Sequence, residues 1–595
     1  MSGAVDGGTI ARPKSLVVRE VQPAVLEQPA DGRWFIDFGR AAFGTIQLDL
    51  ECSSANGAEL AVDLGERLAA PGVVDRNPPG CIRHRHLRVP VRHGRQTLRV
   101  EIPPDRDNTG PDAVLMPSDL FEVLPFRYAE IEAPAGTVTV HEVTQLAVQY
   151  PFDETASAFS CSDDRLNRVW ELCRYSIQAT SFLGMYVDGD RERIPYEGDA
   201  YLNQLGHYCV DSEYELARHS LEYLLFHPTW PTEWALHCVP MAWADYEYSG
   251  ETGLLERYYD ELRHKTLIAL ARDDGLISTL TGLVTPEFLR SVHLDSMEDM
   301  VDWPPASATQ GGTGERDGYD MVPVKTVVNA FHCWNLALFA RIAALLGREE
   351  DRRFFAEQHR QVAQSIQRVC FDTTRGIYVD GEGSRHASLH ANMLPAALGL
   401  VPPEHRVGVA AFLRSRGMAC SVYGAQYLLE AMYRLGDARR ALALMTAEHD
   451  RGWLNMLAVG STITLEAWDW RYKTNLDWNH AWGAAPANII PRFLMGVRPA
   501  APGFRSILVG PQPAGLEWAK AKVPTPGGPL WVEIVQGPGE RFAQLAVTIP
   551  DGSTACVDLS GMLSPETRVA VDGAEDTVQA LRTRPLTVGM HRVQG

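Results

Sequence analysis

The period of the apolar residues changes twice along this chain, and this change limits the possible folds more than any other feature. Between residues 31 and 150 apolar and polar residues alternate, as at Ile46, Leu48 and Leu50, which is typical of half-buried β-strands. From about residue 160 the period becomes helical, and after Pro499 the alternation returns. A chain of 595 residues rarely forms a single core, so we expect separate domains.

The helical stretch begins near Ser162, which we expect to cap a helix. Its apolar stripe consists of Leu166, Val169, Trp170, Cys173 and Ile177. Further helical stripes are predicted at residues 213–226, 252–272, 324–346, 349–370, 408–416, 422–435 and 437–447. In total we expect about a dozen helices, and antiparallel pairs with functional loops at one end favour an α/α barrel. An irregular helical array is the alternative.

These patterns predict a multidomain protein built from one helical and two β-rich domains. The helical domain is expected at residues 156–497 as an (α/α)6 barrel. An N-terminal β-sandwich at residues 1–155 and a C-terminal β-sandwich at residues 498–595 are expected to flank it. The C-terminal strands are predicted in the segments SILVG, PLWVEIV and RFAQLAVTI.

Charge and composition exclude several classes of partner and compartment. The net charge is −20, from 75 acidic and 55 basic residues, so nucleic acid and anionic membranes should be repelled. No run of about 18 apolar residues is present that could span a bilayer. The first residues lack the pattern of an export signal, and the ten cysteines form no CxxC pair. We therefore expect a cytoplasmic protein with reduced thiols.

The densest polar segment runs from Tyr186 to Asp199 and reads YVDGDRERIPYEGD. Arginines alternate there with acids, beside two tyrosines. A solvent-exposed turn held by salt bridges would have this composition as well, so the segment alone does not establish a functional site.

A second polar segment, from Gly460 to Gly483, combines tryptophans with carboxylates. Glu466 lies near four tryptophans, namely Trp468, Trp470, Trp478 and Trp482. Sugars stack their apolar faces on indole rings while carboxylates accept their hydroxyls, so this composition suits a carbohydrate site. Packing of the tryptophans in a core is the alternative. The same pairing of tryptophan with acid recurs at Trp243 with Asp245 and at Asp302 with Trp303.

Competing chemistries find little support. The sequence contains no GxGxxG motif that opens a helix after a strand, no GxxxxGK[ST], no HExxH and no GxSxG. We interpret His84 and His86 as part of a solvated strand or loop, and we expect neither a metal ion nor a cofactor. Two carboxylates that are far apart in sequence and meet in an aromatic cleft suit glycoside hydrolysis.

Several segments resemble glycoside hydrolase family 78, the bacterial α-L-rhamnosidases, and the similarity covers most of the chain. RERIPYEGDA resembles the family's RDER-x-GW-x-GDA segment, and TITLEAWD resembles its TT-x-WE-x-W segment. FIDFGRAAFG and FRYAEI look like its N-terminal sandwich motifs, FSCSDDRLNRVW like its entry into the barrel, and PGFRSILVGPQP like the start of its C-terminal sandwich.

This resemblance implies an inverting α-L-rhamnosidase that acts on rhamnosyl glycosides. By position, Glu192 is the general acid and Glu466 the general base. The resemblance also implies substrate-binding residues, which are Asp188, Arg191, Tyr196, Asp199, Trp243, Asp245, Asp302, Trp303, Trp470 and His480.

The sequence departs from the family pattern near both glutamates. Asp190 stands where an arginine is common, Tyr196 replaces a tryptophan, and the stretch from Glu466 to His480 is shorter. We hypothesise that Asp188 and Arg191 take over the missing contacts. A related glycosidase for another sugar and a non-catalytic carbohydrate-binding protein remain alternatives. The aglycone, the linkage and the oligomeric state are not predicted.

Overall fold

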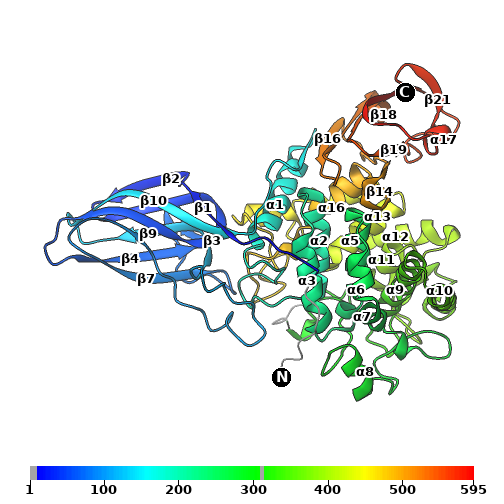
Figure 1. Ribbon diagram of the computed structural model, residues 1–595, viewed down its shortest axis with the longest axis horizontal. Helices are drawn as coiled ribbons and strands as arrows, with labels where there is room; N and C mark the ends of the chain where they lie inside the picture. The colour runs from blue at the N-terminus through cyan, green and yellow to red at the C-terminus, as the bar shows by residue number, and fades with distance from the viewer. Residues whose placement is uncertain (1–9, 309–313) are drawn as a thin grey trace.

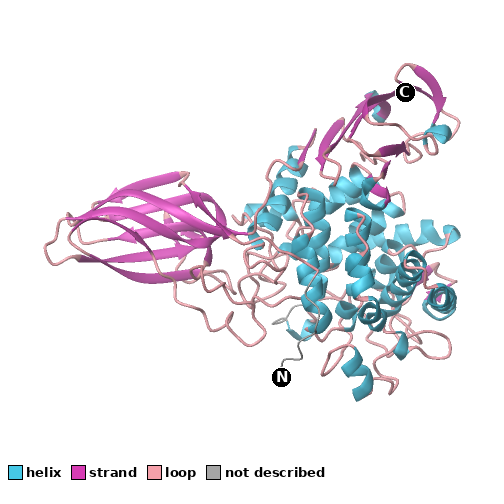
Figure 2. Ribbon diagram, viewed as in Figure 1, coloured by secondary structure: helices cyan, strands magenta, loops and turns pink. Residues whose placement is uncertain are grey.

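The computed structural model describes residues 10–308 and 314–595. Helices form the centre of the molecule, and a sheet domain lies at each end (Figures 1 and 2). This order of sheet, helices and sheet is the one that the changes of apolar period predict.

The N-terminal domain is an antiparallel sheet of eight strands. Its order is β1-β10-β3-β9-β4-β7, and β2 and β8 both pair with β3. The strands are β1 (Val17–Val21), β2 (Val25–Ala30), β3 (Arg33–Cys52), β4 (Ala58–Gly65), β7 (His84–Val91), β8 (Gly94–Arg99), β9 (Leu124–Glu132) and β10 (Val138–Gln149), with a short hairpin of β5 (Leu68–Ala70) and β6 (Val73–Val74).

The long strand β3 joins both layers of this domain. Its register against β9 shifts between Asp37 and Ala42, where Gly39 has a φ of +82°. Ile36 before the bend and Leu48 after it are fully buried in one apolar cluster. The expected two-layered sandwich is therefore a single hydrogen-bonded sheet that folds over at β3.

The helical domain contributes most of the molecule's core. Its helices are α1 (Asp164–Thr180), α2 (Glu197–Val210), α3 (Glu215–Phe226), α4 (Thr232–Ala235), α5 (Cys238–Ser249), α6 (Gly253–Arg257), α7 (Tyr259–Lys265), α8 (Pro286–Ser291), α9 (Thr326–Leu345), α10 (Glu349–Cys370), α11 (Leu389–Ala397), α12 (Arg406–Arg416), α13 (Gly424–Arg434), α14 (Ala438–Met445), α15 (Trp453–Ala458) and α16 (Pro486–Ile489). A hairpin of β12 (Phe371–Asp372) and β13 (Ile377–Tyr378) follows α10.

Neighbouring helices pack in pairs, with α9 against α10, α11 against α13, and α2 against both α5 and α16. Helix α9 is long and apolar enough to cross a membrane by length and composition, with a mean hydropathy of 1.2. However, 78% of that stretch is buried inside the molecule, as expected for a core helix of a globular domain.

The C-terminal domain contains a seven-stranded and a three-stranded sheet. The larger has the order β11-β16-β17-β18-β22-β20-β21, and the smaller β14-β15-β19. The strands are β11 (Ala158–Cys161), β14 (Val497–Ala501), β15 (Ser506–Val509), β16 (Trp518–Val523), β17 (Leu530–Gly537), β18 (Arg541–Ile549), β19 (Thr554–Val557), β20 (Arg568–Val571), β21 (Ala574–Thr577) and β22 (Gly589–Gln594), and the short helix α17 (Val578–Leu581) follows β21. Strand β11 precedes the first helix in sequence but pairs with β16, so the chain touches the C-terminal sheet before it enters the helical domain.

Two local predictions were wrong. Asp163, and not Ser162, caps α1, because its side chain accepts the Arg165 N–H. The stripe at 252–272 is broken into α6, α7 and a 3-10 turn. His84 and His86 lie on strand β7 as interpreted, with the side chain of His86 48% exposed, and their rings lie 2.8 and 3.1 Å from the buried carboxylate of Asp63.

Candidate active site

The acidic turn, residues 188–194, lies between α1 and α2 and is closed by its own hydrogen bonds. The Asp188 N–H donates to the Ile194 carbonyl at 3.0 Å, and the Ile194 N–H donates to Asp188 Oδ1 at 3.0 Å. Gly189 has a φ of +102°, and a Cβ there would lie 2.6 Å from the Asn479 carbonyl oxygen. Glycine therefore allows the close approach of this turn to the segment around Asn479.

The Glu466 segment, residues 460–483, doubles back on itself. The His480 N–H donates to the Thr464 carbonyl at 2.9 Å, and the Thr464 hydroxyl donates to the His480 carbonyl at 2.8 Å. Further along, the Glu466 N–H donates to the Asp477 carbonyl at 3.3 Å, and the Asp477 N–H donates to Glu466 Oε2 at 3.3 Å. Both the backbone and the carboxylate of Glu466 are thus held in place.

One guanidinium group links the two segments. Arg191 donates from Nη1 to Glu192 Oε1 at 2.6 Å and from Nη2 to Glu466 Oε1 at 2.7 Å. Lys473 Nζ lies 2.9 Å from the same Glu466 oxygen. The Tyr196 hydroxyl donates to Glu192 Oε2 at 3.2 Å. The two glutamates therefore meet at one place although they are far apart in sequence.

These groups line a cavity of about 300 Å³, which we call the carboxylate pocket. Its apolar walls consist of Trp230, Pro231, Trp234, Met300, Trp303 and Trp482, and its other polar groups are Asp188, Asp199, Asn475 and His480. The ring of Trp234 lies against α2, where a Cβ on Gly198 would come within 2.9 Å of it. Indole walls with convergent carboxylates match what a pyranose ring requires.

The two glutamates differ in depth. The side chain of Glu466 is 2% exposed, whereas that of Glu192 is 32% exposed. Glu466 therefore lies at the floor of the pocket and Glu192 lies nearer to solvent.

Burial perturbs other ionisable groups of the pocket. Desolvation raises the pKa of Asp188 well above its usual value, although Arg191 and His480 oppose this. His480 Nε2 lies 2.6 Å from Asp199 Oδ1, and Nδ1 lies 3.6 Å from Asp477 Oδ1. Burial alone would lower the pKa of His480, but these two carboxylates raise it well above its usual value. The imidazole is therefore protonated at neutral pH and holds Asp199 in position.

The N-terminal domain supports both segments from behind. Arg83 Nε lies 2.7 Å from Asp190 Oδ2, and Asn108 Nδ2 donates to the Asp190 carbonyl at 2.9 Å. The Asp190 N–H donates to Asn479 Oδ1 at 2.8 Å, and Asn479 Nδ2 donates in turn to Glu66 Oε1 at 3.1 Å. This chain of polar contacts connects the acidic turn, the Glu466 segment and the sheet domain.

The model of the bacterial α-L-rhamnosidase six-hairpin glycosidase domain matches residues 154–494, which is more than half of the chain. The chain belongs to the bacterial α-L-rhamnosidase family. The model of the C-terminal domain of these rhamnosidases matches residues 496–571.

Individual relatives of the rhamnosidase family are distant. An α-L-rhamnosidase of Alteromonas sp. (strain LOR) is 24% identical over 279 residues, which is 43% of this chain and 29% of the relative. The structure of α-L-rhamnosidase from Dictyoglumus thermophilum has a TM-score of 0.77 at 16% identity and covers 98% of this chain and 64% of that one. The structure of Streptomyces avermitilis α-L-rhamnosidase complexed with L-rhamnose has a TM-score of 0.73 at 17% identity. It covers 98% of this chain and 54% of that one. The structural likeness establishes a shared fold, and this chain spans less than a third of the curated relative.

Most of the catalytic and substrate-binding residues that the sequence predicted line the carboxylate pocket. The predicted residues that line the carboxylate pocket are Asp188, Arg191, Glu192, Tyr196, Asp199, Trp303, Glu466 and His480. They come from the acidic turn, the start of α2, the loop after α8 and the Glu466 segment.

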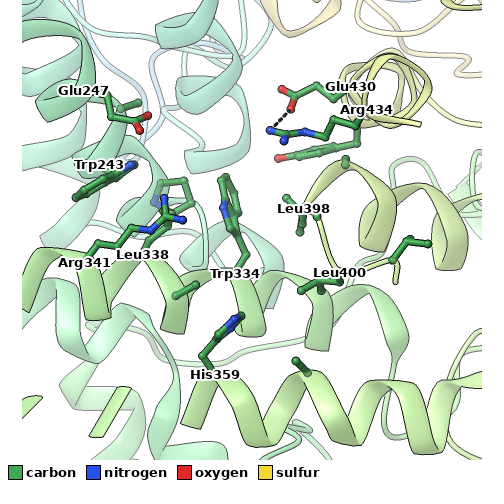
Figure 3. Close-up of a pocket in the computed structure, with 18 of the residues that line it drawn as sticks. Trp243, Glu247, Trp334, Leu338, Arg341, His359, Leu398, Leu400, Glu430 and Arg434 are labelled. Atoms are coloured by element: carbon green, nitrogen blue, oxygen red, sulfur yellow. Dashed lines mark ion pairs between the residues drawn. The ribbon is translucent and has the colours of Figure 1, made fainter. Parts of the chain in front are cut away.

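Trp243 and Asp245 do not line this pocket. Both lie on α5, where residues two apart point in nearly opposite directions. Asp245 faces α3 and accepts hydrogen bonds from Arg218 at 2.9 Å and Tyr208 at 3.1 Å. Trp243 faces a different cavity (Figure 3). The structure therefore does not bring these two residues together with Glu192 and Glu466.

Asp302 and Trp470 are also outside the pocket lining. Asp302 is fully buried and accepts hydrogen bonds from His390 Nε2 at 2.7 Å and the Ser421 N–H at 3.0 Å. It supports the neighbouring Trp303 by accepting that residue's N–H at 2.8 Å. Trp470 is 56% exposed. The predicted contacts of both residues with substrate remain predictions.

The sequence interpretation missed several lining residues. These are Trp230, Met300, Lys473 and Asn475. Lys473 offered a signal, because it is a cation between Glu466 and Asp477 in a segment already singled out for its carboxylates. Met300 offered none, because its position depends on a tertiary contact of its loop with α4.

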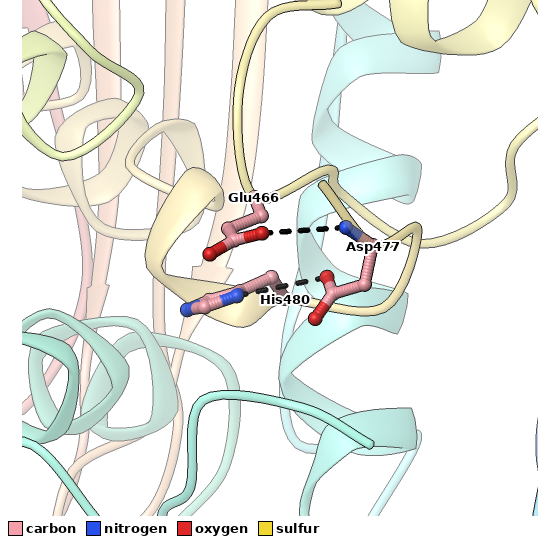
Figure 4. A group of neighbouring side chains, drawn as sticks. All are labelled: Glu466, Asp477 and His480. Atoms are coloured by element: carbon pink, nitrogen blue, oxygen red, sulfur yellow. Dashed lines mark hydrogen bonds and ion pairs between the residues drawn. The ribbon is translucent and has the colours of Figure 1, made fainter. Parts of the chain in front are cut away.

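Glu466, Asp477 and His480 each place one potential metal-binding atom within 4.8 Å of the others (Figure 4). These side-chain types can bind a divalent cation. However, one oxygen of Glu466 already contacts both Arg191 and Lys473, at 2.7 and 2.9 Å. Side-chain cations therefore compensate the charge that a metal ion would otherwise balance.

Proposed function

We propose that this protein is an inverting α-L-rhamnosidase whose helices close into an (α/α)6 barrel around the carboxylate pocket. The observation that carries the proposal is the pair Glu192 and Glu466, which share the guanidinium of Arg191 inside a cavity walled by indole rings. The match to the six-hairpin glycosidase domain supports the barrel and the reaction class.

Glu466 is the general base in this proposal. It lies at the floor of the pocket, 2% exposed, and Arg191 and Lys473 hold its carboxylate in place. It removes a proton from a water molecule that attacks the anomeric carbon from the side opposite to the leaving group.

Glu192 is the general acid. Its 32% exposure places it near the mouth of the pocket, where the aglycone must leave. It donates a proton to the glycosidic oxygen as the bond to the anomeric carbon breaks. Arg191 Nη1 and the Tyr196 hydroxyl position the carboxyl group, through contacts of 2.6 and 3.2 Å.

The choice of L-rhamnose rests on the names of the relatives and on the small size of the change in the pocket. The Streptomyces relative is described as complexed with L-rhamnose. Of the three departures from the family pattern, Asp190 is turned away from the pocket and pairs with Arg83 and Arg193, each at 2.7 Å. Tyr196 lies in the lining, and the shortened stretch contributes Lys473 and Asn475 to it. A glycosidase for another sugar is the competing proposal, because Tyr196 contributes to the wall.

We also propose a cytoplasmic location. All ten cysteines are free thiols, eight of them buried, as is usual in a reducing compartment.

A panel of 4-nitrophenyl glycosides tests the substrate. We expect the highest kcat/KM for the α-L-rhamnoside, with the α-L-arabinoside, β-D-glucoside and α-D-mannoside at least about tenfold lower, because polar groups of the pocket would lose hydroxyl partners. Equal or higher kcat/KM for another sugar would reject rhamnose.

Glu192→Gln tests the acid. We expect kcat for an alkyl α-L-rhamnoside to fall by roughly 10²–10⁴-fold, and kcat for the 2,4-dinitrophenyl α-L-rhamnoside to fall much less, because an acidic leaving group needs little protonation. Thermal unfolding checks that the variant is folded. Equal losses on both substrates would remove Glu192 from the acid role.

A further inference from the structure

A second and larger cavity lies among the helices, away from the carboxylate pocket. We call it the Trp334 cavity (Figure 3), and its volume is about 880 Å³. It is bounded by parts of α2, α5, α9, α10 and α13 and by the chain after α11. No lining residue is shared between the two cavities.

A packed aromatic layer separates the two cavities. Trp234, in the wall of the carboxylate pocket, lies 5.5 Å from the ring of His237. His237 lies 5.6 Å from Tyr201, and Tyr201 lies 6.1 Å from Trp334. These rings lie between the two cavities, so a ligand in the Trp334 cavity would not compete directly for the carboxylate pocket.

Two indole rings and a free cation stand together in this cavity. Figure 3 shows the Arg341 side chain extending between Trp243 and Trp334. Both indoles are partly exposed. Among the described residues Arg341 has no carboxylate within ion-pair distance, although its charge acts on Glu247 from further away.

The other charges of the cavity leave this cation uncompensated. Arg492 lies 2.9 Å and Arg434 3.7 Å from Glu430, so two cations share one carboxylate. Burial raises the pKa of Glu247, although Trp243 and the arginines act against this. Of the two carboxylates in the cavity, Glu247 and Glu430, Glu247 therefore contributes less negative charge. In a chain with a net charge of −20, the cavity has a local excess of positive charge.

We propose that the Trp334 cavity binds a ring compound that carries a carboxylate, with the carboxylate on Arg341 and the ring against Trp243 and Trp334. Guanidinium groups bind carboxylates through paired hydrogen bonds, and indole faces stack on both sugar rings and aromatic rings. Two sources have this chemistry, a uronic acid and an aromatic carboxylic acid. The site is independent of the reaction proposed for the carboxylate pocket.

Isothermal titration calorimetry with two acids and their neutral analogues tests this site. The probes are D-glucuronate with D-glucose as its analogue, and 4-hydroxybenzoate with 4-hydroxybenzamide. We expect at least one acid to bind, its neutral analogue to bind at least about tenfold more weakly, and added salt to weaken binding of the acid. The acid that binds more tightly shows whether the natural ligand is a uronic acid or an aromatic carboxylic acid.

Variants locate the binding. Arg341→Gln should weaken binding of the acid at least about tenfold, because it removes the charge but keeps most of the exposed side chain. Arg353→Gln, at an exposed arginine on α10, is the matched control and should have no effect. Saturation with L-rhamnose should leave the affinity unchanged.

Three results would overturn the proposal. They are no binding of either acid at millimolar concentrations, equal affinity of the acid for wild type and Arg341→Gln, and competition by L-rhamnose. None of them depends on whether the protein hydrolyses rhamnosides, so failure of this site and failure of the proposed function are distinguishable.

Discussion

Asp188 differs from the other carboxylates of the pocket because nothing neutralises it at close range. Its Oδ2 is buried and accepts no hydrogen bond from the described residues, and Arg191 lies 3.7 Å away. Burial raises its pKa well above the usual value. We infer that Asp188 is protonated at neutral pH and can donate a hydrogen bond to a sugar hydroxyl.

Substitution of Asp188 tests this protonation state. Asp188→Asn should keep kcat/KM for an aryl rhamnoside within about tenfold of wild type, because an amide also donates a hydrogen bond at this position. Asp188→Ala should lower it by roughly 10–100-fold. A loss with Asn as large as that with Ala would show that the ionised carboxylate is needed.

At the residue scale the sequence predicted the carboxylates of the pocket better than its walls. Glu192, Glu466 and His480 were named through the resemblance of their segments to the rhamnosidase family, and all three line the pocket. Trp243 lies in another cavity, because local sequence does not determine which face of α5 meets the pocket. Trp230 lies in a short loop, and only tertiary packing brings it to the wall.

At the scale of elements, the residues just before β7 connect the sheet domain to the acidic turn. Arg83 contacts Asp190 through Nε and also donates from Nη2 to the Asp190 carbonyl at 2.7 Å. Asp190 is 1% exposed and lies two residues before Glu192. Removal of Arg83 would leave one oxygen of a buried carboxylate without its partner.

Arg83→Met should therefore disturb catalysis from outside the pocket. We expect kcat to fall by about tenfold or more, since a small displacement of a catalytic group has a large effect, while KM changes less. Arg83→Met combined with Asp190→Asn should recover part of the loss, because the amide needs no second cation and Arg193 keeps its contact with Glu122 at 2.8 Å. Arg88→Gln, an exposed arginine on β7, is the control. Wild-type kcat in Arg83→Met would contradict a positioning role.

The apolar period predicted the bounds of a helix well where the helical pattern ran without interruption by a turn. The stripe at 349–370 matches α10 in both bounds, whereas 252–272 failed because Leu267 adopts a φ of +58° that ends the helix. The pairing of β11 with β16 joins residues more than 350 positions apart, and no local pattern contains that information.

At the scale of the whole molecule, several buried acids should make stability depend on pH. Burial raises the pKa of Glu66 to about 8, of Glu315 to about 8 and of Glu233 to about 7. These groups bind protons in the folded state that the unfolded chain releases above its ordinary pKa of about 4.3. Their contribution is complete below that pH and is lost as the pH rises through the folded pKa.

Urea unfolding between about pH 5 and pH 8 measures this dependence. We expect the free energy of unfolding to fall as the pH rises, and His480, with its raised pKa, to act in the same direction. Glu233→Gln should flatten the curve up to about pH 7, because a neutral side chain replaces the titrating one. Rising stability over this range would contradict the assignment of these acids.

The sheet, helix and sheet order of the chain was predictable because each change of apolar period marks a change of core. The contact between the N-terminal domain and the acidic turn was not, because Arg83 and Glu66 lie more than 100 residues from the groups they hold. Residues of the N-terminal domain thus support two segments of the pocket without lining it.

Proton NMR of the first-formed sugar tests the central claim most directly. Inversion needs Glu192 and Glu466 to stand far enough apart to admit a water molecule, roughly 6.5–9.5 Å between carboxyl groups. Hydrolysis of an α-L-rhamnoside should then release β-L-rhamnose first, with the α anomer appearing only as mutarotation proceeds. Initial release of α-L-rhamnose would contradict both the inverting mechanism and the role of Glu466 as a base acting on water.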